Sequence, residues 1–80
     1  MAKTRYTIGY VGETTQPLQG DALQIARVME TEMGGAPLTR GQIEGLIRII
    51  SDAQGFGKWV NIDKVRDELV STGFLEVTTL

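Results

Sequence analysis

Residues 38–77, LTRGQIEGLIRIISDAQGFGKWVNIDKVRDELVSTGFLEV, decide the fold, because helix start and stop signals stand at each joint of this stretch. At its beginning the Thr39 side chain can accept a hydrogen bond from the amide of Gln42 while the Gln42 side chain reaches back, which is a capping box. Apolar residues then recur at helical spacing, with charged residues between them. This pattern predicts a helix over residues 40–53.

A second helix is predicted to begin at Asn61, a residue type that caps helices well. Asp63 follows in the first turn, where the helix dipole favours a negative charge. Gly73 suits the left-handed position just after a helix, so we expect the helix to end there. Over residues 74–79 apolar and β-branched residues alternate weakly, and this alternation predicts a strand.

The residues before this stretch predict one more strand and one more helix. Over residues 4–11 apolar and aromatic residues, of which Tyr10 is one, alternate with polar ones, as in a strand with one buried face. A polar loop containing Pro and Gly follows. Asp21 is then expected to cap a helix that ends at Gly34.

The predicted order is therefore β-α-α-α-β, an α+β fold in a single domain over residues 1–80. Two isolated strands are marginal, so we expect the N- and C-terminal strands to pair in a small antiparallel sheet against which the three helices pack. A short third strand at residues 58–60 is a candidate to join them. Phe56 and Trp59 lie in the glycine-rich loop between the last two helices. They are either core residues or exposed anchors of a binding surface.

The absence of two residue types restricts the chemistry of the chain. None of the 80 residues is Cys or His, which excludes disulfides, thiolate zinc sites, histidine-based triads and histidine metal sites. Lys and Arg number 8 against 10 Asp and Glu, and a net charge of −2 does not favour phosphate backbones or anionic membranes. No apolar run approaches the ~18 residues of a membrane span, and the first residues do not resemble a signal peptide. We therefore expect a cytoplasmic protein that is not an enzyme and has no cofactor.

The sequence LVSTGFLEV at residues 69–77 resembles the close of a winged-helix domain, in which the recognition helix ends in Leu, then Gly, then an apolar strand. Two features depart from that family: residues 54–60 leave no room for its intervening helix, and the sequence ends where its wing should begin. The resemblance implies, as an alternative, a truncated winged-helix DNA-binding protein or transcriptional regulator. Its phosphate contacts would be Arg40, Arg48, Lys58, Lys64 and Arg66.

Residues 52–63 are similar to an EF-hand calcium loop, because acidic residues stand at the first and twelfth positions and Gly57 at the sixth. Phe56, however, occupies the fifth position, where the loop needs an oxygen ligand, and Gln54 at the third carries no charge. A Ca²⁺ ion would keep most of its water here, so we expect no metal site.

The remaining expectation is a small, slightly acidic domain that binds another protein. Asp63 and Asp67 share one helix face, as a catalytic carboxylate pair would, but Lys64 and Glu68 at the same spacing predict a solvated, paired surface. In size and character the chain resembles small phage-encoded inhibitors or adaptors, including anti-CRISPR proteins, which occupy a surface of a larger nucleic-acid machine. We expect the partner contacts to be Glu30, Glu32, Asp52, Phe56, Trp59, Asp63, Asp67 and Glu68.

Overall fold

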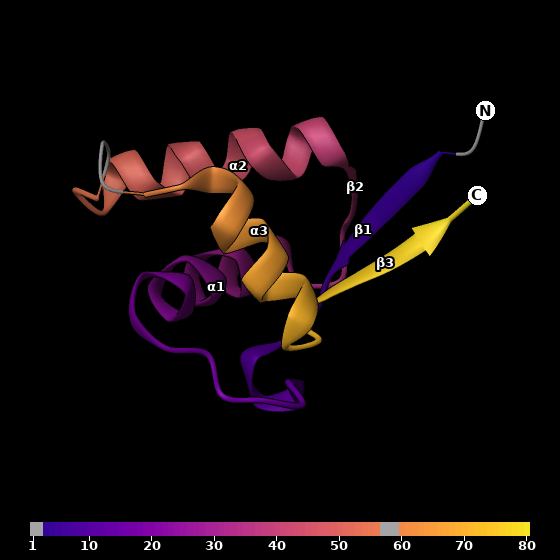
Figure 1. The fold of residues 1–80 in the computed structure, drawn as a ribbon, viewed down its shortest axis with the longest axis horizontal. Coiled ribbons are helices and arrows are strands. Elements are labelled where there is room, and N and C mark those ends of the chain that lie inside the picture. The colour runs from indigo at the N-terminus through magenta and orange to yellow at the C-terminus, as the bar shows by residue number, and fades with distance from the viewer. Residues whose placement is uncertain (1–2, 57–59) are drawn as a thin grey trace.

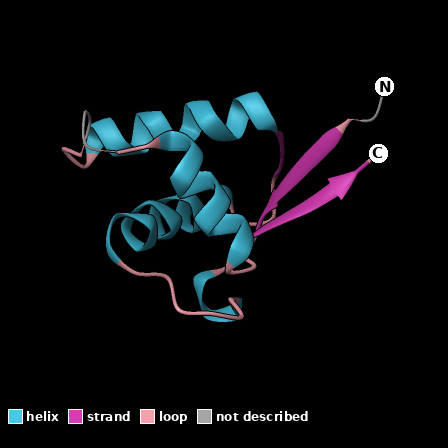
Figure 2. Ribbon diagram, in the orientation of Figure 1, coloured by secondary structure: helices cyan, strands magenta, loops and turns pink. Residues whose placement is uncertain are grey.

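The structure is a computed structural model that describes residues 3–56 and 60–80. Three helices pack against one end of a three-stranded antiparallel sheet (Figures 1 and 2). In chain order the elements are β1 (Thr4–Ile8), the 3₁₀ helix η1 (Val11–Glu13), α1 (Gly20–Met33), β2 (Pro37–Thr39), α2 (Arg40–Ala53), α3 (Ile62–Ser71) and β3 (Leu75–Thr79). The α+β class and the three helices are confirmed.

The sheet has the order β2-β1-β3, with β1 antiparallel to both neighbours. The pairing of β1 with β3 runs from Thr4 opposite Thr79 to Ile8 opposite Leu75, which confirms that the first and last strands pair. The third strand is β2, immediately before α2. The strand considered at residues 58–60 lies mostly outside the described residues, and Val60 is not in a strand.

The core lies where the helices meet the sheet. Its largest fully buried apolar side chains come from every main element except the short β2: Ile8, Ile25, Met29, Ile43, Ile47, Leu69, Phe74 and Leu75. Such residues bury apolar area against one another at close packing density, so the helical faces predicted from spacing are the faces that hold the molecule together. No helix in the described ranges is long and apolar enough to cross a membrane.

Local signals fix the ends of α2 and α3. The Thr39 hydroxyl accepts from the Gln42 amide at 3.2 Å and the Gln42 side chain accepts from the Thr39 amide at 2.9 Å, which confirms the capping box. The Asn61 side chain accepts from the Lys64 amide at 3.1 Å, as predicted. Gly73 follows α3 with φ of 88°, a left-handed conformation that glycine adopts without strain.

Two predictions in the first half of the chain are wrong. The first strand ends at Ile8 and not at residue 11, because residues 11–13 form η1, in which the Glu13 amide donates to the Tyr10 carbonyl at 3.0 Å. The chain turns at this contact, and Tyr10 is 44% exposed instead of buried. Asp21 lies inside the first turn of α1, which begins one residue earlier, and does not cap it.

Candidate functional site

One buried arginine, Arg66, joins α3 to α2. Its guanidinium donates to Glu44 of α2 and, within α3, to Asp63 at 3.0 Å and Asp67 at 3.2 Å. The Arg66 side chain is 10% exposed, whereas the side chains of Asp63 and Asp67 are each 72% exposed. Arg40 also approaches Glu44, at 3.7 Å. Three carboxylates therefore surround one buried cation, and two of them, those of Asp63 and Asp67, face solvent.

The charge of Arg66 is held firmly in this cluster. Burial alone would lower the pKa of Arg66, but the hydrogen bond to Asp67 and the charges of Asp67, Asp63 and Glu44 outweigh that effect and raise the pKa. A guanidinium already bound to three carboxylates has few donors left for a phosphate. Arg66, expected under the DNA-binding alternative to contact phosphate, instead binds inside the protein.

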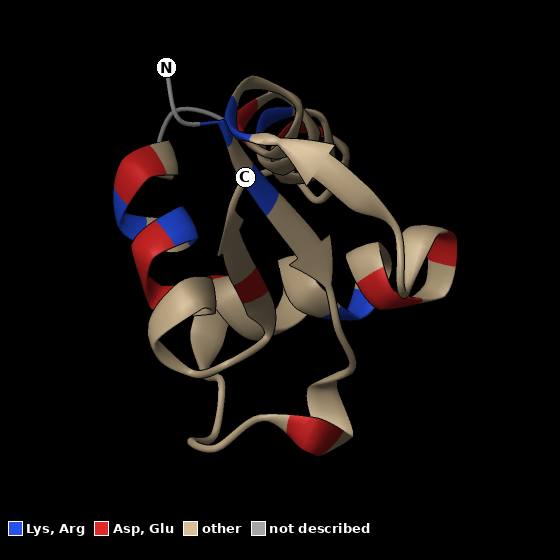
Figure 3. Cartoon of the chain, turned by 90° about the vertical axis from the view of Figure 1, so that its right-hand side faces the viewer, with Lys and Arg blue, Asp and Glu red and all other residues tan. Residues whose placement is uncertain are grey.

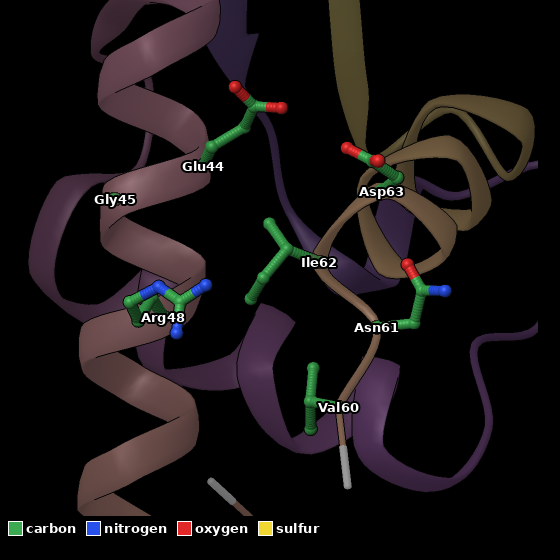
Figure 4. Close-up of a pocket in the computed structure, with 7 residues that line it drawn as sticks. All are labelled: Glu44, Gly45, Arg48, Val60, Asn61, Ile62 and Asp63. Atoms are coloured by element: carbon green, nitrogen blue, oxygen red, sulfur yellow. The ribbon is translucent and has the colours of Figure 1, made fainter. Parts of the chain in front are cut away.

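A cleft of about 470 Å³ opens beside this cluster, between α2 and the start of α3 (Figure 4). Ile62 points across it toward α2, and Arg48 stands on the α2 side. Gly45 leaves the α2 wall open, because a Cβ there would meet no atom within 4 Å. Glu44 and Asp63, the two acids of its lining, are the ones that hold Arg66. The two acids of this cleft are therefore already paired, and Arg48 is the one basic residue among the described residues of its lining.

A second hollow, which we call the α1–α2 groove, is apolar. It consists of two adjoining hollows of about 400 and 290 Å³ that share three lining residues, Met33, Leu46 and Ile49. Val28 of α1 and Leu38 of β2 extend the apolar lining, and the groove has one charged lining residue, Glu32. Ile49 is 67% exposed, the highest value for a large apolar side chain among the described residues. The groove thus presents aliphatic surface to solvent.

The residues expected to contact a partner are not brought to one place. Glu32 alone lines the α1–α2 groove, while Asp63 and Asp67 stand beside Arg66 on α3. Glu68 lines a separate hollow of about 420 Å³ between α1 and α3. Among the expected contacts, Glu30 is half-buried on α1 and Asp52 is exposed on α2.

Of the two aromatic residues of the loop, Phe56 is within the described residues. Phe56 is half-buried and packs against the core cluster, so it acts mainly as a core residue beneath the end of α2. Its amide donates to the Ser51 carbonyl at 2.8 Å, and the Gly55 amide donates to the Asp52 carbonyl at 3.1 Å. These two bonds form a Schellman motif that closes α2. Trp59 lies outside the described residues.

The basic residues of the DNA-binding alternative are also dispersed. Arg40 approaches Glu44, Arg48 stands at the cleft, and Lys64 lines the hollow between α1 and α3. Lys58 lies outside the described residues. In Figure 3, α3 carries blue and red segments in alternation and no continuous blue stripe. Interleaved charges of both signs repel phosphate as much as they attract it.

Neither a metal site nor a catalytic constellation is found in the described ranges. No group of three Asp or Glu side chains there is arranged to hold a metal ion. Asp63 and Asp67, which were considered as an acid–base pair, both bind the Arg66 guanidinium. The ion pair predicted between Lys64 and Glu68 is not among those formed by the described residues.

Comparison with known proteins finds no matching family model, no matching curated protein and no matching solved structure. The surfaces themselves therefore carry the functional argument. The α1–α2 groove was missed in the sequence because its apolar residues belong to three elements. One signal was present: Ile49 is apolar, yet it falls outside the helical face that contains Ile43, Ile47 and Ile50.

Proposed function

We propose that this chain is a non-enzymatic protein-binding domain whose α1–α2 groove receives an apolar segment of another protein. The observation that carries the proposal is Ile49, 67% exposed in a hollow whose lining is mostly apolar. Scattered exposed apolar residues are ordinary on protein surfaces, but contiguous apolar surface in a concave site is typical of interaction sites. Transfer of such aliphatic surface from water supplies the driving force for binding.

The lining also indicates the chemistry of the partner. Glu32 is the one charged residue of the groove, and Asp52 is exposed on α2, three residues after Ile49. A segment that places aliphatic side chains over Ile49 and a Lys or Arg near Glu32 would complement the groove in both shape and charge. An amphipathic helix of a partner meets this requirement, because it presents such side chains at helical spacing.

The test is affinity capture from extracts of the organism that makes the protein, with recovered proteins quantified by mass spectrometry. We expect Ile49→Glu to lower the recovery of a specific set of proteins by roughly tenfold or more, because the substitution places a charge in the apolar contact. Gln16→Glu is the matched control, because it adds the same charge at an exposed position that lines none of the hollows described. Equal recovery with both variants would contradict the proposal.

At a finer level, we propose a small phage-type inhibitor or adaptor that acts on a larger nucleic-acid machine, as anti-CRISPR proteins do. Size, net charge of −2 and the exposed acids of α3 support it, because a basic nucleic-acid channel attracts such a surface. The expected result is that the proteins lost with Ile49→Glu are nucleic-acid-binding proteins and that added duplex competes for them. If the proteins lost with Ile49→Glu include no nucleic-acid-binding proteins, the proposal of an inhibitor or adaptor of a nucleic-acid machine is contradicted.

The truncated winged-helix regulator stays the alternative, and no feature of the described surface favours it. A gel-shift experiment at low salt separates the two functions. We expect no retardation of duplex DNA by the wild-type chain, because the cations of α2 and α3 are dispersed or paired. Retardation that is abolished by Lys64→Glu would support DNA binding instead.

A further inference from the structure

The two edges of the sheet differ in which backbone groups they expose, and the register shows it. Lys3 and Leu80 exchange two backbone bonds, the Lys3 amide to the Leu80 carbonyl at 3.3 Å and the reverse at 2.6 Å. In an antiparallel pair such exchanging residues alternate with residues whose N–H and C=O point outward. The register places Arg5 opposite Thr78, two residues along, so this pair also exchanges bonds.

The alternation continues to the pair of Thr7 and Glu76, so the residues between the bonded pairs point their backbone groups away from β1. On β3 these are Val77 and Thr79, together with Leu75, which is buried. Within the described ranges, β1 is the only strand beside β3, and none of the side-chain hydrogen bonds involves the N–H or C=O of Val77 or Thr79. In Figure 3, β3 forms one margin of the sheet, with β1 and β2 on its other side. We call this row of groups the β3 edge.

The opposite margin, formed by β2, is closed. Leu38 pairs with Tyr6 in the register that also brings the Ile8 amide to the Ala36 carbonyl at 3.0 Å, so Pro37 and Thr39 are the outward residues. Pro37 has no N–H to offer. The Thr39 amide already donates to the Gln42 side chain at 2.9 Å. Both outward donors of β2 are thus removed.

The sequence of β3 contains one of the devices that usually protect an edge strand, the charge of Glu76, and lacks the others. Residues 75–79 contain no Lys, Pro or Gly, and three of the five are the β-branched Val77, Thr78 and Thr79. Val77 is 41% exposed. Such a row of unpaired groups is a template for another strand.

The charge around the β3 edge selects the occupant. Glu76 is exposed on β3 itself. It is the one acidic residue of this strand, and residues 75–79 contain no basic residue. A second copy of this chain would meet the edge across a two-fold axis and bring Glu76 toward the Glu76 of the other copy. A segment with basic side chains would find an opposite charge instead.

We propose that the β3 edge is a second docking site, at which an extended segment of a partner protein with alternating basic residues adds as a fourth strand beside β3. Backbone bonds to Val77 and Thr79 supply the register, and contact with Glu76 supplies the preference for Lys and Arg. The site is independent of the α1–α2 groove and of what that groove binds.

The test uses a capped hexapeptide of alternating lysine and valine, with an alternating glutamate and valine hexapeptide as the control ligand. Amide hydrogen exchange of the full chain is followed by NMR. We expect the lysine peptide to slow exchange at Val77 and Thr79 by roughly tenfold and to leave Glu76 and Thr78 unchanged, because their amides already bond to β1. The glutamate peptide should have no effect.

Two proline variants give the binding control. Val77→Pro removes an outward N–H without removing a bond to β1. We expect this variant to bind the lysine peptide with roughly tenfold lower affinity. If its fold is disturbed, Thr79→Pro tests the neighbouring outward donor in the same way. Binding that persists in a folded proline variant, or protection by both peptides alike, would overturn the proposal. Protection at Val77 that rises with protein concentration in the absence of peptide would also overturn it, since the occupant would be a second copy.

Discussion

The two margins of one small sheet show how differently a chain can treat groups of the same kind. On β2, Pro37 removes one outward donor, and the capping box of α2 takes the amide of Thr39. On β3, Val77 and Thr79 keep theirs. The closure of β2 comes from the same Thr39 and Gln42 that start a helix, so one local motif serves both helix initiation and edge protection. The difference marks β3 as the margin where another chain can join.

The largest effect should come from proline substitutions that separate inward from outward residues of β3. Thr78→Pro removes an amide that bonds to β1, and we expect it to lower the free energy of unfolding by about 2 kcal/mol or more. Thr79→Pro changes the same residue type but removes an outward amide, so a loss of at most about 1 kcal/mol is expected. Urea unfolding measures both. Equal losses would mean that the register assigned to β3 is wrong.

The next effect concerns Arg66, which joins α3 to α2. Arg66→Ala leaves Glu44, Asp63 and Asp67 close together without their cation. We expect a loss of about 1 to 3 kcal/mol in the free energy of unfolding, below the usual cost of breaking a buried pair because two of the acids are exposed. Arg48→Ala, which removes an exposed arginine of the cleft, is the control and should change stability by less than about 0.5 kcal/mol.

The same cluster gives a pH prediction with a definite sign. Because the pKa of Arg66 is raised in the folded chain, its stabilisation is complete at any pH below its ordinary pKa and is lost only in strong alkali. The Arg66 contribution should therefore stay constant between about pH 6 and pH 9. The wild-type minus Arg66→Ala difference in unfolding free energy, measured at both ends of that range, tests this. A difference that falls markedly by pH 9 would contradict it.

The smallest effect is expected from variants that restore the outward N–H donors of β2. Gln42→Ala removes the acceptor of the Thr39 amide and should cost about 0.5 to 1 kcal/mol, as a lost cap does. Combined with Pro37→Val, it restores both outward donors of β2. We expect the Thr39 amide to exchange faster in this double variant than in the wild type, by NMR. Unchanged exchange at Thr39 would show that β2 is covered in some other way.

Local signals explain what was predictable from the sequence. The helix ends predicted from the sequence are confirmed, because each depends on residues only a few positions apart. These are Thr39 with Gln42 at the start of α2, Asn61 at the start of α3 and Gly73 after its end. The pairing of the terminal strands followed from the rule that strands need partners. Tyr10 was misplaced because the chain turns into η1 directly after it, and the alternation of apolar and polar residues carries no signal for that turn.

The candidate sites were less predictable for a related reason. Glu32, Asp63 and Asp67 were identified as exposed acids, but their neighbours could not be known before α1, α2 and α3 were placed. Strand β2 has three residues, one of them proline, and gives too short a pattern to detect. The exposed donors of β3 depend on the register with β1, since a shift of one residue would exchange inward and outward groups.

The most direct test of the open margin is amide hydrogen exchange in the protein alone, without any ligand. Our account predicts that the Val77 amide exchanges much faster than those of Glu76 and Thr78, its neighbours on either side, because these two bond to β1 and Val77 does not. Slow exchange at Val77, equal to that of its neighbours at every protein concentration, would contradict it.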